Sequence, residues 1–155
     1  GAKGYETVVL HGDWVRAATN TDLARLSDTI AGLRRVGVSD IVLLGGVPRY
    51  YPNMPRRLLR AGATLDAPLR IRADLDEVLE RDAELREIAE ANGGPFVSFV
   101  DAVCDAGRCD AVIAASDGTY QPVVWDNGHV THEGAMHVLR ALAASDPATF
   151  GRLLD

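Results

Sequence analysis

An aspartate and a histidine three residues apart, Asp126 and His129, carry the clearest chemical signal in this sequence. The spacing allows the carboxylate to hold one ring nitrogen of the imidazole and to leave the other nitrogen available for proton transfer. Such a pair is two thirds of a Ser-His-Asp triad, in which the acid orients the base. The alternative interpretation is a polar turn that only caps the next helix, because Asp-Asn-Gly is also favourable turn chemistry.

The elements around this pair favour the chemical interpretation. The apolar run 123–125 precedes it, and Thr131 is predicted to cap an amphipathic helix that ends near Ala144. The pair therefore lies where a strand gives way to a helix, which is the kind of edge at which α/β folds place their sites.

Alternating strands and helices are predicted along the rest of the chain. Buried strands are expected at 7–10, 41–44 and 96–100, separated by helices from Asn20 or Thr21 to about Val36 and from Asp74 to Ala91. This order implies a parallel sheet with right-handed crossovers. In the second helix the residues expected to face inward are Leu75, Val78, Leu79, Leu85 and Ile88. Further short strands are expected at 112–115 and 122–125, with a short helix after Pro147.

Composition sets limits on the class of protein. The chain has 155 residues, which predicts one domain, and 47% of them are hydrophobic, which is enough to build a core. The net charge of −6 argues against nucleic-acid binding and against docking on an anionic membrane surface. No apolar run approaches the roughly 20 residues that a membrane-spanning helix needs.

The two cysteines, Cys104 and Cys109, flank a glycine in a short loop. A loop of this length can bring two Cα atoms within the roughly 7 Å that a disulfide requires. We therefore expect a disulfide and an oxidising compartment, with two free thiols as the alternative. A metal site is not expected here, because two thiolates do not complete a tetrahedral shell.

Beyond the pair itself, Asp126-x-x-His129 followed by Val-Thr-x-x-Gly-Ala resembles the last motif block of SGNH hydrolases. The closest resemblance is to the periplasmic SGNH domain fused to acyltransferase-3 type membrane proteins, which O-acetylate surface polysaccharides. Segments 5–14, 41–50 and 99–109 resemble further blocks of those domains, in the same order. The likeness covers most of this chain and only the C-terminal part of the family's domain.

The resemblance implies a three-layer α/β/α sandwich with a parallel sheet, SGNH-like and therefore flavodoxin-like, whose N-terminal strand is missing. It implies carbohydrate O-acyl transfer or ester hydrolysis on a carbohydrate or acyl-ester substrate, with His129 as general base and Asp126 as its orienter. That chemistry requires no cofactor. The resemblance also implies a membrane acyltransferase domain in the same parent protein and a periplasmic or other extracytoplasmic location.

One departure from the family leaves the enzyme assignment open. The Gly-Asp-Ser block that carries the nucleophile is not found, and the nearest match is Gly12-Asp13-Trp14. Together with His11, the segment Gly12-Asp13-Trp14 is more similar to another block of the family, which contributes a glycine and an asparagine to the oxyanion hole. The asparagine of that block is missing here. We expect His11, Gly12, Asp13 and Trp14 near the pocket. Either the serine lies in a segment outside this chain, or the domain is a non-catalytic glycan-binding or scaffolding module.

Three further expectations concern binding and assembly. Tyr50 and Tyr51 are candidates for stacking on a sugar ring, with solvated loop aromatics as the alternative. A metal held by Asp126, His129 and His132 is a further alternative, although no metal is expected. Without the family's first strand, the strand at 7–10 has an open edge, which favours a homodimer or a partner segment.

Overall fold

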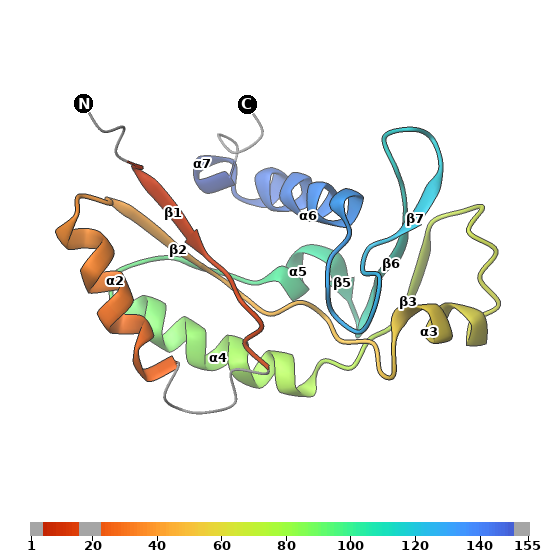
Figure 1. Ribbon diagram of the computed structural model, residues 1–155, viewed down its shortest axis with the longest axis horizontal. Helices are drawn as coiled ribbons and strands as arrows, with labels where there is room; N and C mark the ends of the chain where they lie inside the picture. Colours follow the sequence, from red (N-terminus) through yellow and green to blue (C-terminus); the bar gives the residue numbers. More distant parts are fainter. Residues whose placement is uncertain (1–4, 16–22, 151–155) are drawn as a thin grey trace. The chain divides into compact units, whose positions relative to one another are not determined.

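The computed structural model describes residues 5–15 and 23–150 (Figure 1). The chain forms two compact units, one made of Gly1–Gly46 and Asp76–Ser98 and the other of Val47–Leu75 and Phe99–Asp155. Each unit combines two separated stretches of sequence, so the units interleave along the chain. The expectation of a single domain stays a prediction.

The first unit contains the parallel sheet that the sequence predicts. Its strands are β1 (Thr7–Leu10), β2 (Asp40–Leu44) and β4 (Phe96–Val97), in the order β1-β2-β4. Helix α2 (Leu26–Arg35) lies between β1 and β2 in the sequence, and α4 (Asp76–Ala91) precedes β4. Among the described residues β1 pairs only with β2 and is an edge strand, as expected.

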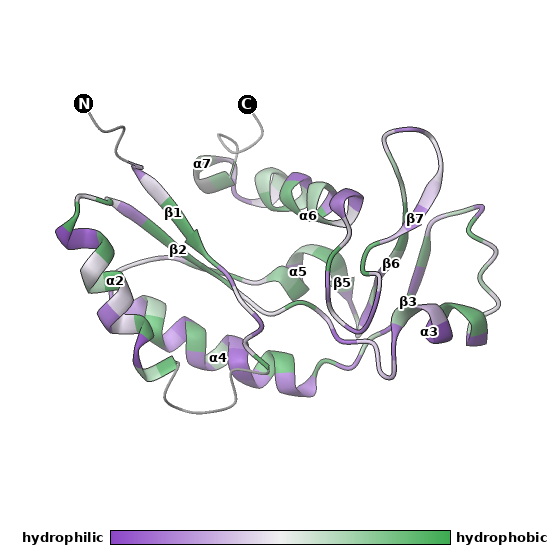
Figure 2. Ribbon diagram, in the orientation of Figure 1, coloured by the Kyte–Doolittle hydropathy of each residue, from purple (hydrophilic) through white to green (hydrophobic). Residues whose placement is uncertain are grey.

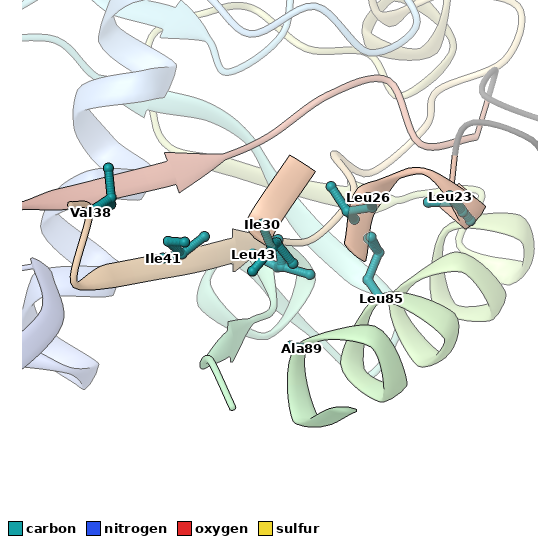
Figure 3. Packing of buried hydrophobic residues seen from close by; sticks show 8 residues of the cluster. All are labelled: Leu23, Leu26, Ile30, Val38, Ile41, Leu43, Leu85 and Ala89. Carbon is teal, nitrogen blue, oxygen red and sulfur yellow. The ribbon is translucent and has the colours of Figure 1, made fainter. Parts of the chain in front are cut away.

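One hydrophobic cluster of this unit lies on one face of the sheet. Ile41 and Leu43, which alternate along β2, meet the buried side chains of α2 and α4 there (Figure 3). Burial of each such leucine or isoleucine stabilises the fold by about 1.5–3 kcal/mol relative to an exposed side chain. The cluster consists of Leu23, Leu26, Ile30, Val38, Ile41, Leu43, Leu85 and Ala89. The apolar positions of two helices and one strand therefore position the end of β2.

The helix boundaries differ in detail from the sequence prediction. The expected caps Asn20 and Thr21 lie outside the described residues. Helix α4 begins at Asp76, two residues later than expected, and alternates polar and apolar segments along its length (Figure 2). Leu79 is 46% exposed, so its expected inward position is wrong. The buried positions are Val78, Asp82, Leu85 and Ala89, and Leu79 is rotated about 100° away from Val78.

The second unit contains an antiparallel sheet that the sequence analysis only partly anticipated. Strands β3 (Leu69–Arg72), β6 (Arg108–Ala114) and β5 (Cys104–Asp105) lie in the order β3-β6-β5, and β7 (Tyr120–Pro122) also pairs with β6. The helices of this unit are α3 (Met54–Arg60), α5 (Phe99–Val103), α6 (His132–Ser145) and α7 (Pro147–Phe150). The expected strand at 112–115 is the end of β6, and the one expected at 122–125 lies slightly earlier, as β7.

The strand predicted at 96–100 is shorter than expected. Strand β4 ends at Val97, and Phe99 begins the short helix α5. Phe99, Val100 and Val103 are buried in that helix. A short apolar run fits a buried strand and a buried helical turn equally well, so periodicity could not separate the two.

The expected disulfide between Cys104 and Cys109 is present, with the two Cα atoms 4.0 Å apart. The cysteines face each other across the β5–β6 hairpin. Its two turn residues, Ala106 and Gly107, have φ values of +48° and +74°, the combination that a tight type I′ hairpin turn requires. None of the helices in the described part of the chain is long and apolar enough to span a membrane.

Candidate functional site

The carboxylate of Asp126 organises the turn that carries the predicted pair. Its Oδ1 accepts hydrogen bonds from the backbone N–H of Gly128 at 2.9 Å and of His129 at 2.8 Å. Its Oδ2 lies 2.6 Å from Nδ1 of the His129 ring. One carboxylate therefore shapes the backbone and holds the imidazole at the same time.

The backbone on either side closes this turn. The N–H of Trp125 donates to the carbonyl of His129 at 3.0 Å, and Val124 and Val130 form an isolated antiparallel bridge. The N–H of Thr131 then donates to the carbonyl of Val123 at 2.9 Å. The turn is thus the tip of a narrow two-stranded ladder.

A distant segment of the same unit also holds the turn. The carbonyl of Asp126 accepts a hydrogen bond from the N–H of Met54 at 2.8 Å, and the carbonyl of Asn127 accepts one from Tyr50 at 3.0 Å. A side chain at Gly128 would collide with Arg49, since a Cβ there would lie 2.1 Å from Nη1. The 49–54 segment and the turn are therefore closely fitted.

Two further residues of the motif have structural roles. Thr131 caps α6 as predicted, because its hydroxyl oxygen accepts the N–H of Gly134 at 3.0 Å. The same hydroxyl donates to the carbonyl of Pro122 at 2.8 Å. At Gly134 a Cβ would lie only 2.1 Å from the carbonyl oxygen of Val123, so α6 approaches the preceding strand backbone directly.

The electrostatics of the pair favour an ionised Asp126 carboxylate. Partial burial alone would raise the pKa of the Asp126 carboxyl, but the N–H groups of Gly128 and His129 and the imidazole outweigh it and lower the pKa to about 2. An ionised carboxylate only accepts hydrogen bonds, so Nδ1 carries the proton in the neutral ring. The His129 side chain is 61% exposed, and within the described residues Nε2 makes no hydrogen bond. Nε2 can therefore take a proton from a hydroxyl.

Trp125 is a neighbour of the pair that the sequence analysis did not assign to the site. Its ring stacks on the His129 ring with centroids 5.4 Å apart and planes 26° apart. The residue is 60% exposed. Its position immediately before Asp126 could have indicated that it belongs to the site, because a large apolar side chain next to a polar turn is not expected to be buried in the core.

No serine completes the triad in this structure. None of the five serines of the chain, all of which lie in described segments, hydrogen bonds to His129. In the same unit, Ser116 donates to Glu133 at 2.9 Å and Ser145 donates to the carbonyl of Leu142 at 3.0 Å.

The two tyrosine candidates have different environments. Tyr50 is only 1% exposed, so its expected role in stacking on a sugar is wrong. Its burial, followed by the charge of Asp110, raises the pKa of its hydroxyl. Tyr51 is 45% exposed and remains a candidate, with its backbone N–H held by Asp74 at 2.9 Å.

The candidates for the oxyanion region lie in the other unit. Trp14 donates its indole N–H to the carbonyl of Leu44 at 2.9 Å, and Nδ1 of His11 lies 3.4 Å from the same oxygen. A Cβ at Gly12 would lie 3.6 Å from the Trp14 ring. These contacts fix the residues after β1 to the end of β2. Their role in a pocket, with that of Asp13, stays a prediction.

A buried carboxylate of the first unit was missed. Asp82 of α4 is 5% exposed, and its Oδ1 accepts the N–H of Gly46 at 2.8 Å. Its Oδ2 accepts the hydroxyl of Ser98 at 3.3 Å. A Cβ at Gly45 would lie 2.7 Å from this carboxylate, so the glycine pair after β2 makes room for it. The two consecutive glycines after β2 were the feature of the sequence that could have indicated a close contact at this point.

A second histidine–aspartate pair lies elsewhere in the second unit. Nε2 of His137 is 2.9 Å from Oδ2 of Asp110, whose other oxygen pairs with Nε of Arg70 at 2.8 Å. The three side chains border an open pocket of about 510 Å³ and connect β3, β6 and α6. In the described part of the chain no three potential metal ligands cluster, so the alternative triple of Asp126, His129 and His132 does not form.

Comparisons with known proteins agree with this architecture. The family described as "SGNH domain (fused to AT3 domains)" matches residues 2–144. No curated protein sequence matches the chain significantly. The periplasmic domain of a lipopolysaccharide acetyltransferase from Salmonella ser. Paratyphi A has a similar fold, with a TM-score of 0.70 and 20% sequence identity. The match covers 90% of this chain and 56% of that one, so this chain spans little more than half of its length. With the family match extending over nearly all of its residues, the chain belongs to the SGNH domains of the kind fused to AT3 domains.

Proposed function

We propose that this domain takes part in acyl transfer to a carbohydrate, or in hydrolysis of a carbohydrate ester, with His129 as general base and Asp126 as its orienter. The observation that carries the proposal is the 2.6 Å contact between Asp126 Oδ2 and His129 Nδ1, combined with the open Nε2. The similar structure is that of a lipopolysaccharide acetyltransferase domain, which supports a saccharide and an acetyl group as substrates. The chemistry requires no cofactor.

The proposed reaction follows from the positions of the protons. Nε2 of His129 removes the proton of a serine hydroxyl as its oxygen attacks the acyl carbon, and Asp126 stabilises the resulting imidazolium. The imidazolium then returns the proton to the leaving oxygen, which departs and leaves an acyl-serine. A sugar hydroxyl or water, deprotonated by the same nitrogen, then attacks the acyl carbon, and the bond to the serine oxygen breaks as that oxygen takes the proton back from Nε2. The serine of this reaction is proposed to come from a segment outside these 155 residues.

The domain is proposed to act outside the cytoplasm, joined to a membrane acyltransferase domain in the same parent protein. The family description and the periplasmic origin of the similar structure support this location. The Cys104–Cys109 disulfide also favours an oxidising compartment. Alkylation of free thiols in intact cells tests the location: we expect no labelling of either cysteine before reduction, and labelling of both in the native protein contradicts it.

The direct test is hydrolysis of p-nitrophenyl acetate by the parent protein with its natural upstream residues. His129→Ala is expected to lower the turnover by about 10²–10⁴-fold, the usual contribution of a general base. His132→Ala is the matched control, because that histidine is exposed at the first residue of α6. Its turnover should stay close to that of the unsubstituted protein. Retained activity in His129→Ala, or equal losses in both variants, would contradict the assignment.

A non-catalytic glycan-binding module is the second candidate function. The observation in its favour is that no serine of the chain hydrogen bonds to His129. It predicts saturable saccharide binding with no ester turnover, in the parent protein as well as in this domain alone. Turnover that depends on His129 excludes it.

We also propose that the edge of β1 pairs with a second copy or with another segment of the parent protein. β1 has one neighbour, β2, among the described residues, and the backbone groups on its other edge can pair with a further strand. Sedimentation velocity over a range of concentrations should show self-association that Thr7→Lys weakens, because a charge on an edge strand opposes pairing. A monodisperse monomer at every concentration would contradict pairing between copies.

A further inference from the structure

The exposed indole beside the dyad is the feature that the proposed reaction leaves unused. Trp125 is 60% exposed, although tryptophan side chains usually bury most of their area. Its backbone N–H is bonded to the carbonyl of His129, so the side chain starts from a fixed point at the base of the turn. Its ring lies on the imidazole, with centroids 5.4 Å apart. An apolar surface is therefore held in the open next to the proposed general base.

We infer that Trp125 forms a saccharide-binding subsite in which a pyranose ring stacks on the indole face that His129 leaves uncovered. An indole has two faces, and the near-parallel imidazole takes part of one. A pyranose presents C–H groups on one face and hydroxyls around its rim, so it can bury apolar area on an indole while its hydroxyls stay in water.

The position of the subsite specifies which sugar it holds. Stacked rings lie about 4.5–7 Å apart, so a sugar on the far face of Trp125 is separated from His129 by the thickness of the indole. That distance suits the neighbour of the acyl-accepting unit in an oligosaccharide, rather than the accepting unit itself. Trp125 therefore acts in acceptor binding and selects for a chain of sugars. This inference rests on the proposed function for the identity of the ligand class.

Binding can be measured without any turnover. The 155-residue chain is titrated with the methyl pyranosides of glucose, galactose, mannose and rhamnose and with maltotriose, following tryptophan emission and saturation-transfer NMR. The chain has two tryptophans, and Trp14 is bonded to Leu44 in the other unit. It serves as an internal reference. At least one saccharide should give a saturable change in emission, and Trp125→Phe should abolish that change while keeping most of the NMR-detected affinity.

Trp125→Ala should weaken the NMR-detected affinity by about two- to twelvefold, which is the range for aromatic stacking contributions of about 0.5–1.5 kcal/mol. The matched control is Tyr5→Ala, which removes an aromatic side chain that is 81% exposed in the other unit. It should leave the affinity unchanged. Should the alanine variant not fold, Trp125→Phe still decides the emission measurement.

Three outcomes overturn the inference: no saturable binding of any saccharide, equal affinity in Trp125→Ala, or an equal loss in Tyr5→Ala. The esterase assay keeps the two proposals separate. Saccharide binding that depends on Trp125 in a protein without His129-dependent turnover refutes the enzymatic proposal alone. Turnover that depends on His129 without saccharide binding at Trp125 refutes the subsite alone.

Discussion

Replacement of Asp126 by asparagine separates the two roles of this side chain. The amide oxygen of Asp126→Asn can still accept the N–H groups of Gly128 and His129, which now bond to Oδ1 at 2.9 and 2.8 Å. The negative charge opposite Nδ1 is lost, and the amide NH₂ takes its place. Since an NH₂ group donates, it favours the ring tautomer that carries its proton on Nε2, which cannot act as a base. We therefore expect the turn to survive and the esterase activity to fall.

The effect on stability follows from the pKa of the carboxyl. The fall of this pKa from its usual 3.8 to about 2 corresponds to at most about 2.4 kcal/mol, since one pKa unit is worth about 1.36 kcal/mol. The side chain is 28% exposed, and solvent screening reduces the expected contribution to about 1 kcal/mol. Because the folded pKa is the lower one, this stability is fully present above pH 3.8 and is lost as the pH falls through about 2.

Urea unfolding followed by circular dichroism tests this. Asp126→Asn should lower the free energy of unfolding by about 1 kcal/mol at pH 6 and by about half as much at pH 3. Asp117→Asn is the matched control, because Asp117 also accepts a backbone N–H, that of Thr119 at 2.9 Å, without facing a histidine. Its loss should be smaller. Equal stabilities of the unsubstituted and Asp126→Asn proteins at pH 6, or a difference that does not shrink at pH 3, would refute the electrostatic reasoning.

Three further predictions concern the framework of the fold. Gly134→Ala should destabilise the fold by about 2–3 kcal/mol, because its Cβ would lie 2.1 Å from the carbonyl oxygen of Val123. Gly32→Ala in α2 should stabilise the fold by about 0.5–1 kcal/mol, because its Cβ meets nothing closer than 3.7 Å. Thermal melting measures both variants. Shifts of the melting temperature in the same direction for the two variants would contradict the packing described. Replacing Cys104 and Cys109 together by alanine should cost about 2 kcal/mol for a loop with a sequence separation of 5. Urea unfolding checks this, and no change would show that the short hairpin is ordered without the bond.

The sequence was most informative where one local rule decided the outcome. β-Branched runs placed β1 and β2, Thr131 placed the start of α6, and the Asp126–His129 spacing gave the contact that the structure shows. These features depend on residues that are close in the chain. The apolar run at 96–100 was predicted as one strand, but its last two residues belong to α5, and no local rule separates a short buried strand from a buried helical turn.

Features that depend on contacts between distant parts of the chain could not be predicted from local sequence patterns. Tyr50 resembled an exposed loop aromatic, but the backbone bond from its N–H to Asn127 holds it in a buried position. Asp82 resembled one more charge on an acidic helix, and only the approach of Gly45 and Gly46 shows why it is buried. The antiparallel pairing of β3 with β6 joins segments almost forty residues apart, which no local pattern reports.

The hydrogen bonds from the N–H groups of Met54 and Tyr50 to the carbonyls of the 126–127 turn have a consequence for engineering. A peptide or a transplanted loop that carries only residues 122–135 would contain every residue of the motif but would lack the 49–54 segment, whose backbone N–H groups bond to the turn. A graft that is meant to reproduce the dyad needs the 49–54 stretch as a second graft. Screens for altered specificity should likewise randomise that stretch together with the turn, since the two are joined by hydrogen bonds to the carbonyls of Asp126 and Asn127.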